Sequence, residues 1–113
     1  MKIAAYDRIK ENRVEDPEAK EVFIRVLVGS EDGAEKFHMR RFRVRPGGYT
    51  PKHAHAWEHE VFVLAGQGIA LTPEGEKAIT AGDVIFVPGG DLHQFKNNAN
   101  ADLEFLCLIP ALS

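Results

Sequence analysis

Cysteine is scarce in this sequence, and its scarcity removes two kinds of chemistry. Cys107 is the only cysteine among the 113 residues. An intramolecular disulfide needs two cysteines, and structural zinc sites in small proteins usually draw on several thiolates. A disulfide-stapled fold and a thiolate metal cluster are therefore both excluded within this sequence.

Long apolar runs and an excess of basic charge are also missing. No stretch approaches the roughly 18 apolar residues that a membrane-spanning helix requires. The first apolar run, residues 3–6, stops at Asp7 and is too short for a signal peptide, so we expect a cytoplasmic protein without a membrane partner. The formal net charge is -3, which argues against nucleic acid as a partner because phosphates favour a basic face.

What the sequence does contain is a series of short β-like runs separated by glycine and proline. The expected strands cover residues 22–28, 37–44, 60–64, 69–71, 77–80, 84–87 and 103–109. The second of these is expected to stop at Pro46-Gly47-Gly48, and a helical turn is expected only around residues 16–19, behind an Asp cap. So many short strands must hide their edges, which predicts one all-β domain closed as a barrel or jelly roll.

Three of the five histidines lie within seven residues, in His53-Ala54-His55-Ala56-Trp57-Glu58-His59. Residues two apart on a strand point to the same side, so His53 and His55 would present two imidazoles to one point. A bend would return His59 to that point, and His93 is expected at the start of another strand. Imidazole suits several transition metals, although a His-x-His pair by itself also occurs by chance. The residues around the histidines therefore decide whether this pattern indicates a metal site.

The pattern of these residues resembles the cupin superfamily, whose two motifs read G-x5-H-x-H-x3/4-E-x6-G and G-x5-P-x-G-x2-H-x3-N. The second motif matches at Gly82, Pro88, Gly90, His93 and Asn97. The first motif matches at Gly47, His53, His55 and Gly66. The resemblance implies a single-domain cupin jelly roll (a double-stranded β-helix) over residues 1–113, with an N-terminal arm of about residues 1–20 and a barrel core of about residues 37–110.

His59 stands where the family usually has glutamate, and Glu60 is next to it. Anchoring the motif on Gly66 leaves six residues after His59 but only five after Glu60. Strand alternation puts His59 on a face with two valines, whereas Glu60 shares its face with Glu58. A barrel interior accepts the first set better, because carboxylates are seldom buried without a partner. We therefore expect His59, and not Glu60, to be the ligand.

A subset of small cupins is similar over a longer stretch, through Trp-Glu-His-Glu at residues 57–60 and Phe-Leu-Cys-Leu-Ile-Pro at residues 105–110. Members of that group bind manganese through four histidines in a dimeric jelly roll. The resemblance implies a homodimer with one divalent transition metal per chain: manganese first, then iron, nickel, copper or zinc. The implied ligands are His53, His55, His59 and His93.

Strand alternation also places Cys107 and Arg40 inside the barrel. Cys107 is interpreted as a small buried hydrophobe, or alternatively as a thiol near the open side of the metal. Arg40 is interpreted as part of a salt bridge at the surface or barrel end, or alternatively as a partner for a substrate carboxylate. The face shared by Arg41, Arg43 and Arg45 is interpreted as a solvated outer face. Outward apolar packing between subunits is expected at Trp57, Phe62 and Leu64.

These features favour a manganese- or iron-dependent oxidoreductase, resembling a dioxygenase or oxidase, that acts on a small organic molecule in the barrel. Four neutral imidazoles leave the ion its full positive charge and, on a six-coordinate ion, two open positions. A non-enzymatic metal or small-molecule binding module, such as a sensor or storage protein, is the alternative. An isomerase or epimerase comes last, because no inward side chain stands out as a general base.

Overall fold

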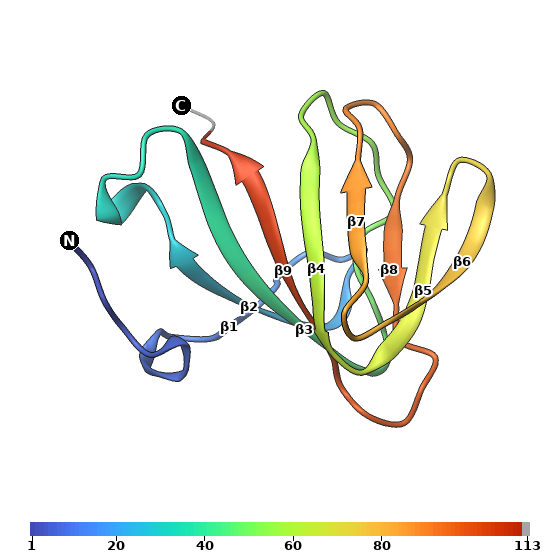
Figure 1. Ribbon diagram of the computed structural model, residues 1–113. Helices are drawn as coiled ribbons and strands as arrows, with labels where there is room; N and C mark the ends of the chain where they lie inside the picture. Colours follow the sequence, from blue (N-terminus) through green and yellow to red (C-terminus); the bar gives the residue numbers. More distant parts are fainter. Residues whose placement is uncertain (112–113) are drawn as a thin grey trace.

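The structure is a computed structural model that describes residues 1–111, and it confirms an all-β jelly roll (Figure 1). The strands are β1 (Asn12–Arg13), β2 (Lys20–Val28), β3 (Phe37–Tyr49), β4 (His59–Ala65), β5 (Gln67–Thr72), β6 (Gly75–Thr80), β7 (Val84–Val87), β8 (Gln94–Lys96) and β9 (Leu103–Pro110). Two short 3-10 helices, η1 (Tyr6–Arg8) and η2 (Ser30–Asp32), accompany them. Within residues 1–111 no helix has the length and apolar character needed to cross a membrane.

The strands form one curled antiparallel sheet in the order β6-β5-β8-β3-β9-β4-β7, with β2 added to β3 and β1 added to β2. In Figure 1, β2, β3 and β9 lean to one side of the view and β5 and β6 to the other. β3 connects the two sides, because it pairs with β9 along residues 37–44 and with β8 at Tyr49. The curl leaves an interior between the two sides, and the functional side chains enter that interior.

β3 is longer than expected, because it does not stop at Pro46-Gly47-Gly48. It continues through these residues to Tyr49. Gly47 adopts a φ of +81°, in the left-handed region that glycine reaches without strain. At Gly48 a side chain is excluded, because a Cβ atom would lie 2.5 Å from the carbonyl oxygen of Lys20 on β2. The glycines therefore bend the strand and let β2 approach it closely.

The expected helical turn at residues 16–19 is wrong. Asp16 instead makes a tight turn, in which its carbonyl accepts a hydrogen bond from the amide of Ala19 and its side chain accepts one from the amide of Glu18, both at 2.9 Å. Such a side-chain bond competes with the helix for the same backbone groups. The two helical turns of the structure lie at Tyr6–Arg8 and Ser30–Asp32.

The core lies on the inner face of the curled sheet. Its buried apolar residues are Val22, Val44, Val61, Val63, Ala70, Ile79, Val87, Phe95, Leu103, Phe105 and Cys107. The opposite face of β3 carries arginines, as expected, but these side chains are ion-paired rather than simply solvated. The pairs are Arg41 with Glu104, Arg43 with Glu11 and Asp102, and Arg45 with Glu21.

Asn97, the last residue of the second motif, has a structural role. Its side chain is buried and its Nδ2 donates to the carbonyl oxygens of Val44 and Ala101, each at 2.8 Å. Its Oδ1 accepts the amide of Ala99 at 3.0 Å. An asparagine here satisfies three backbone groups at once, and so it fixes the connection from β8 to β9.

Candidate metal centre

The four histidines are brought together by one loop and the starts of two strands. His53 and His55 lie in the loop between β3 and β4, not on a strand as expected. Pro51 precedes them, and proline has no amide hydrogen to donate to a strand ladder. His53 alone keeps a β-type contact, an isolated bridge to His93 with hydrogen bonds of 3.2 and 3.0 Å. His93 immediately precedes β8, and His59 opens β4.

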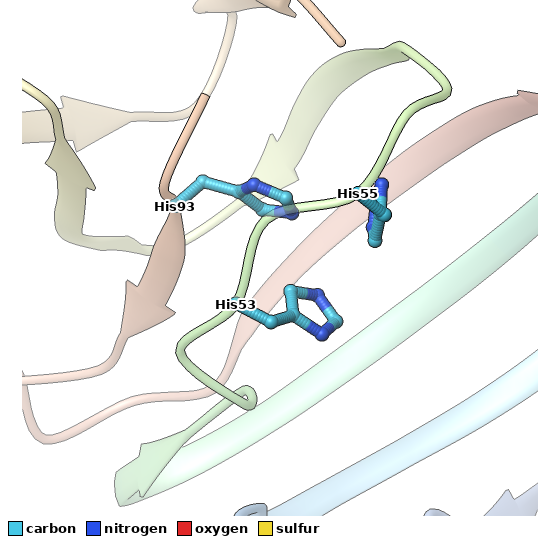
Figure 2. A group of neighbouring side chains, drawn as sticks. All are labelled: His53, His55 and His93. Atoms are coloured by element: carbon cyan, nitrogen blue, oxygen red, sulfur yellow. The ribbon is translucent and has the colours of Figure 1, made fainter. Parts of the chain in front are cut away.

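The rings of His53, His55 and His93 converge on one space, as Figure 2 shows. Their candidate ligand nitrogens all lie within 4.8 Å of one another. His59 adjoins the same group, because its Nε2 lies 2.9 Å from Nε2 of His55. Four rings make six pairs, and five of those pairs have centroids between 4.6 and 5.1 Å apart. Such a cluster is compact enough for one ion to contact several of its rings.

Backbone carbonyls set the tautomers of two of these rings. Nδ1 of His55 lies 3.3 Å from the carbonyl oxygen of Trp57, and Nδ1 of His93 lies 2.9 Å from that of Asp91. A carbonyl oxygen can only accept, so each Nδ1 carries the proton and each Nε2 keeps a free lone pair. Partners of this kind orient histidines that bind metals. These two imidazoles are therefore held in the tautomer that offers Nε2 to an ion.

Burial favours the neutral form of three of the clustered imidazoles, those of His53, His55 and His59. Burial, with the Arg40 guanidinium as the next contribution, lowers the pKa of His59 to about 3. Burial is also the main cause that lowers the pKa of His53 and of His55, and the neighbouring histidines add to both shifts. A histidine must be neutral to bind a metal. The donor set therefore fits a divalent transition ion at neutral pH, and it contains no carboxylate.

A cavity of about 320 Å³ opens beside the cluster, and its walls are mostly apolar. Besides the four histidines, it is lined by Val14, Val22, Arg40, Phe42, Thr50, Pro51, Trp57, Phe95, Phe105, Cys107 and Ile109. Its size lies at the lower end of the range for small-molecule sites. Among the described residues that line it, none is an aspartate, a glutamate or a lysine.

The expected inward residues do point into this cavity. Cys107 is 3% exposed, and its Sγ lies 3.1 Å from Nδ1 of His59, so the thiol sits directly behind that ring. Burial raises the pKa of the Cys107 thiol, against the opposing effect of Arg40. Arg40 enters the cavity and forms no salt bridge to a carboxylate within residues 1–111, so the salt-bridge alternative is wrong.

The exposure of side chains on β4 tests the expectation that His59, and not Glu60, points inward. His59 is 8% exposed and Glu60 is exposed on the opposite face, so the expected division of faces is confirmed. Coordination by His59 stays a prediction, because the convergent set of ligand nitrogens within 4.8 Å consists of His53, His55 and His93.

Trp57 lies in the cavity wall and not on the outward face where it is expected, while its role in packing between subunits stays a prediction. Its ring stacks on that of His55 with centroids 4.0 Å apart and planes 10° apart. The sequence also gave no sign of Val14, which reaches the cavity from the N-terminal arm.

Comparison with known proteins places this geometry in a family. The Cupin_2 family model, described as a cupin domain, matches residues 40–109. The chain is a cupin. The match includes both histidine motifs and ends within β9, so it covers all the residues that line the cavity except Val14 and Val22.

Similar proteins within and around this family differ in what they do. The structure of the polyketide cyclase RemF from Streptomyces resistomycificus superposes with a TM-score of 0.94 at 35% identity, over 99% of this chain and 80% of that one. A 1-methylthio-D-xylulose 5-phosphate methylsulfurylase of Rhodospirillum rubrum is 36% identical over 65% of this chain and 47% of its own length. An oxalate-binding protein of Thermotoga maritima is 37% identical over 61% of this chain and 58% of its own length. The match thus spans about half the length of these two curated relatives.

Proposed function

We propose that this cupin is a metal-dependent enzyme that acts on a small organic molecule in the cavity beside the histidine cluster. The proposed ligands are His53, His55, His59 and His93, and the proposed ion is manganese, with iron next. The observation that carries the proposal is the convergence of imidazoles on the wall of a mostly apolar cavity. Two of the four rings, His59 and His93, are buried, and buried polar groups are costly unless they have partners.

An ion held by neutral imidazoles would supply Lewis-acid or redox chemistry at this wall. The chain's own residues do the rest. The carbonyls of Trp57 and Asp91 hold two rings in the required tautomer, and aromatic walls keep water away from a bound molecule. The described lining holds no carboxylate or lysine to serve as a general base, which again disfavours an isomerase or epimerase.

Two reaction classes are supported by different observations. Polarisation of a carbonyl for ring closure is favoured by the likeness to the polyketide cyclase RemF over nearly the whole chain. A manganese- or iron-dependent oxidation is favoured by the donor set, since four protein ligands leave positions free on a six-coordinate ion. The likeness to an oxalate-binding protein favours a binding module without turnover as the alternative to both.

Elemental analysis of the purified protein, with and without chelation, tests the proposal, beside a His93→Ala variant. We expect one equivalent of manganese or iron per chain, lost on chelation and in the variant. Loaded protein is then assayed with a linear β-triketone probe in air and under nitrogen. A cyclic product formed with loss of water and without dioxygen indicates ring closure, and turnover that needs dioxygen indicates oxidation. Protein that neither contains nor takes up metal would contradict the proposal that the chain is a metal-dependent enzyme.

We also propose that the protein is a homodimer through the outer face of β4 and β7. Phe62, Val84 and Phe86 are 45%, 75% and 57% exposed, and Phe62 and Val84 are direct partners in the sheet. A contiguous apolar patch on a sheet face favours burial against another surface. A second copy offers a matching apolar patch, and two-fold pairing of like surfaces is the commonest arrangement of homo-oligomers.

A further inference from the structure

Arg40 differs from the other arginines of β3. Arg41, Arg43 and Arg45 point outward, and each of them contacts at least one carboxylate. Arg40 points into the cavity and contacts none within the part of the chain that the structure describes. The neighbouring side chains thus provide an internal comparison: Arg40 is half-buried like Arg41 and Arg43, and of these three only Arg40 lacks a carboxylate partner among the described residues.

The contacts of Arg40 leave its positive charge without compensation. Its Nη2 lies 3.1 Å from Sγ of Cys107 and 3.4 Å from Nδ1 of His59, which are both neutral groups. Its guanidinium carbon lies 5.0 Å above the ring of Phe42, which offers only the weak negative face of an aromatic ring. Its Nε is buried and has no hydrogen-bond partner among the described residues.

A half-buried cation whose Nε is buried without a hydrogen-bond partner costs free energy. Removing a charge from water costs free energy that only an opposite charge or several hydrogen bonds can return. Sulfur and an imidazole nitrogen are poor acceptors for a guanidinium, which prefers the paired oxygens of a carboxylate. Because the protein provides no such group here, the geometry assigns that place to a ligand.

We propose that Arg40 is an anion subsite of the cavity and receives the carboxylate of an aromatic or apolar carboxylic acid. This inference rests on the proposed function in one respect, namely that the cavity is the substrate site. The body of the acid would lie against Phe42, Phe95 and Trp57, which supply aromatic wall on the same cavity.

A carboxylate suits this subsite better than a phosphate. The guanidinium fork matches two oxygens on one carbon, and its single charge balances a single negative charge. A phosphate monoester carries up to two charges at neutral pH, and its usual sites combine several cations or backbone amides. The described lining of this cavity offers no second permanent cation.

The protein contains its own reporter for this binding, because Trp57 is the only tryptophan and lines the same cavity. We propose to titrate metal-depleted and metal-loaded full-length protein with benzoate and with benzamide, its neutral isostere, and to follow tryptophan fluorescence. In both forms we expect benzoate to bind at least tenfold more tightly than benzamide. Arg40→Met should abolish this preference, and the matched outward control Arg41→Met should keep it.

Several outcomes would overturn the subsite. Equal affinity of the wild type for benzoate and benzamide would do so without any variant, and a preference that survives Arg40→Met would do so directly. Phenyl phosphate binding tenfold more tightly than benzoate through Arg40 would overturn the carboxylate assignment. A preference present only in loaded protein and lost in His93→Ala would assign the anion to the ion instead. Conversely, an Arg40-dependent preference in protein that takes up no metal would support the anion subsite and contradict the proposed metal-dependent enzyme.

Discussion

Among the single residues of the site, His59 contacts three other functional side chains. One of its nitrogens faces His55 and the other faces Cys107 and Arg40, so the ring connects the proposed metal to the proposed anion subsite. The adjacent Glu60 lies on the other face of β4 and is exposed. Two neighbouring side chains therefore have entirely different surroundings, although either one could fill the glutamate position of the family motif.

His59→Ala should reduce the metal content of the purified protein by at least tenfold, whereas Glu60→Ala should leave it unchanged. The reason is that only His59 presents a neutral donor to the cluster. Elemental analysis of both variants after identical purification measures the effect, with circular dichroism to verify folding. Metal retained in His59→Ala but lost in Glu60→Ala would reverse the assignment of the fourth ligand.

At the scale of elements, an ion pair between Glu11 and Arg43 is one of the contacts that hold the N-terminal arm to the sheet. Glu11, just before β1, accepts hydrogen bonds from Nε and Nη2 of Arg43 on β3, at 3.1 and 2.8 Å. These hydrogen bonds are the main cause that lowers the pKa of Glu11 below its usual value of 4.5, against the opposing effect of burial. The arm that they hold also carries Val14 to the cavity wall.

This pair makes stability depend on pH. Below about pH 5 the unfolded chain protonates Glu11 while the folded chain keeps it ionised, so the unfolded state binds more protons and the free energy of unfolding falls as pH falls. The contribution is complete above that range and is lost once pH drops through the lowered folded pKa. Glu11→Gln should cost about 1 kcal/mol at pH 7 and progressively less toward pH 3.

Urea unfolding of the wild type and of Glu11→Gln between pH 3 and pH 7 measures this difference. Glu31→Gln, at an exposed position in η2, is the matched control and should track the wild type throughout. A constant difference between Glu11→Gln and the wild type over the whole range would mean that the ion pair contributes nothing through its charge.

The elements also show what the sequence could and could not predict. β7 and β9 were predictable because β-branched and aromatic residues fill them between clear turn signals. β8 has only three residues, and it exists because Tyr49 and residues 69–71 pair with it from both sides. The run through Pro46-Gly47-Gly48 was misread as a stop, since the local glycine signal is the same for a turn and for a bent strand.

The candidate site also has one part that the sequence could predict and another part that it could not. The cluster of histidines was predictable from spacing, because their order along the chain is tied to the glycines and prolines that turn it. The neighbours of that cluster were less accessible to sequence reasoning. Val14 reaches the cavity only because the arm pairs with β2, a long-range contact that no local pattern indicates. Trp57 stacks on His55 within a loop, where strand alternation does not decide the direction of a side chain.

For the whole molecule, the two faces of the sheet differ in what covers them. The inner face is filled by the core and the cavity, while the outer face of β4 and β7 leaves Phe62, Val84 and Phe86 exposed. Burying these side chains against a second copy would contribute about 25 cal/mol for each Å² of apolar area removed from water, offset by the entropy lost on association. Dimer formation should therefore be sensitive to a single charge at the centre of the patch.

Phe86→Glu should convert the proposed dimer to a folded monomer in sedimentation equilibrium, because an unpaired carboxylate buried at the interface costs several kcal/mol while the same residue in the monomer is exposed to water. Lys77→Glu, on the exposed strand β6, is the matched control and should leave the association unchanged. Metal content should be equal in both variants, since the patch lies on the face opposite His59. A wild type that sediments as a monomer, or a Phe86→Glu variant that still forms a dimer, would place the subunit contact elsewhere or remove it.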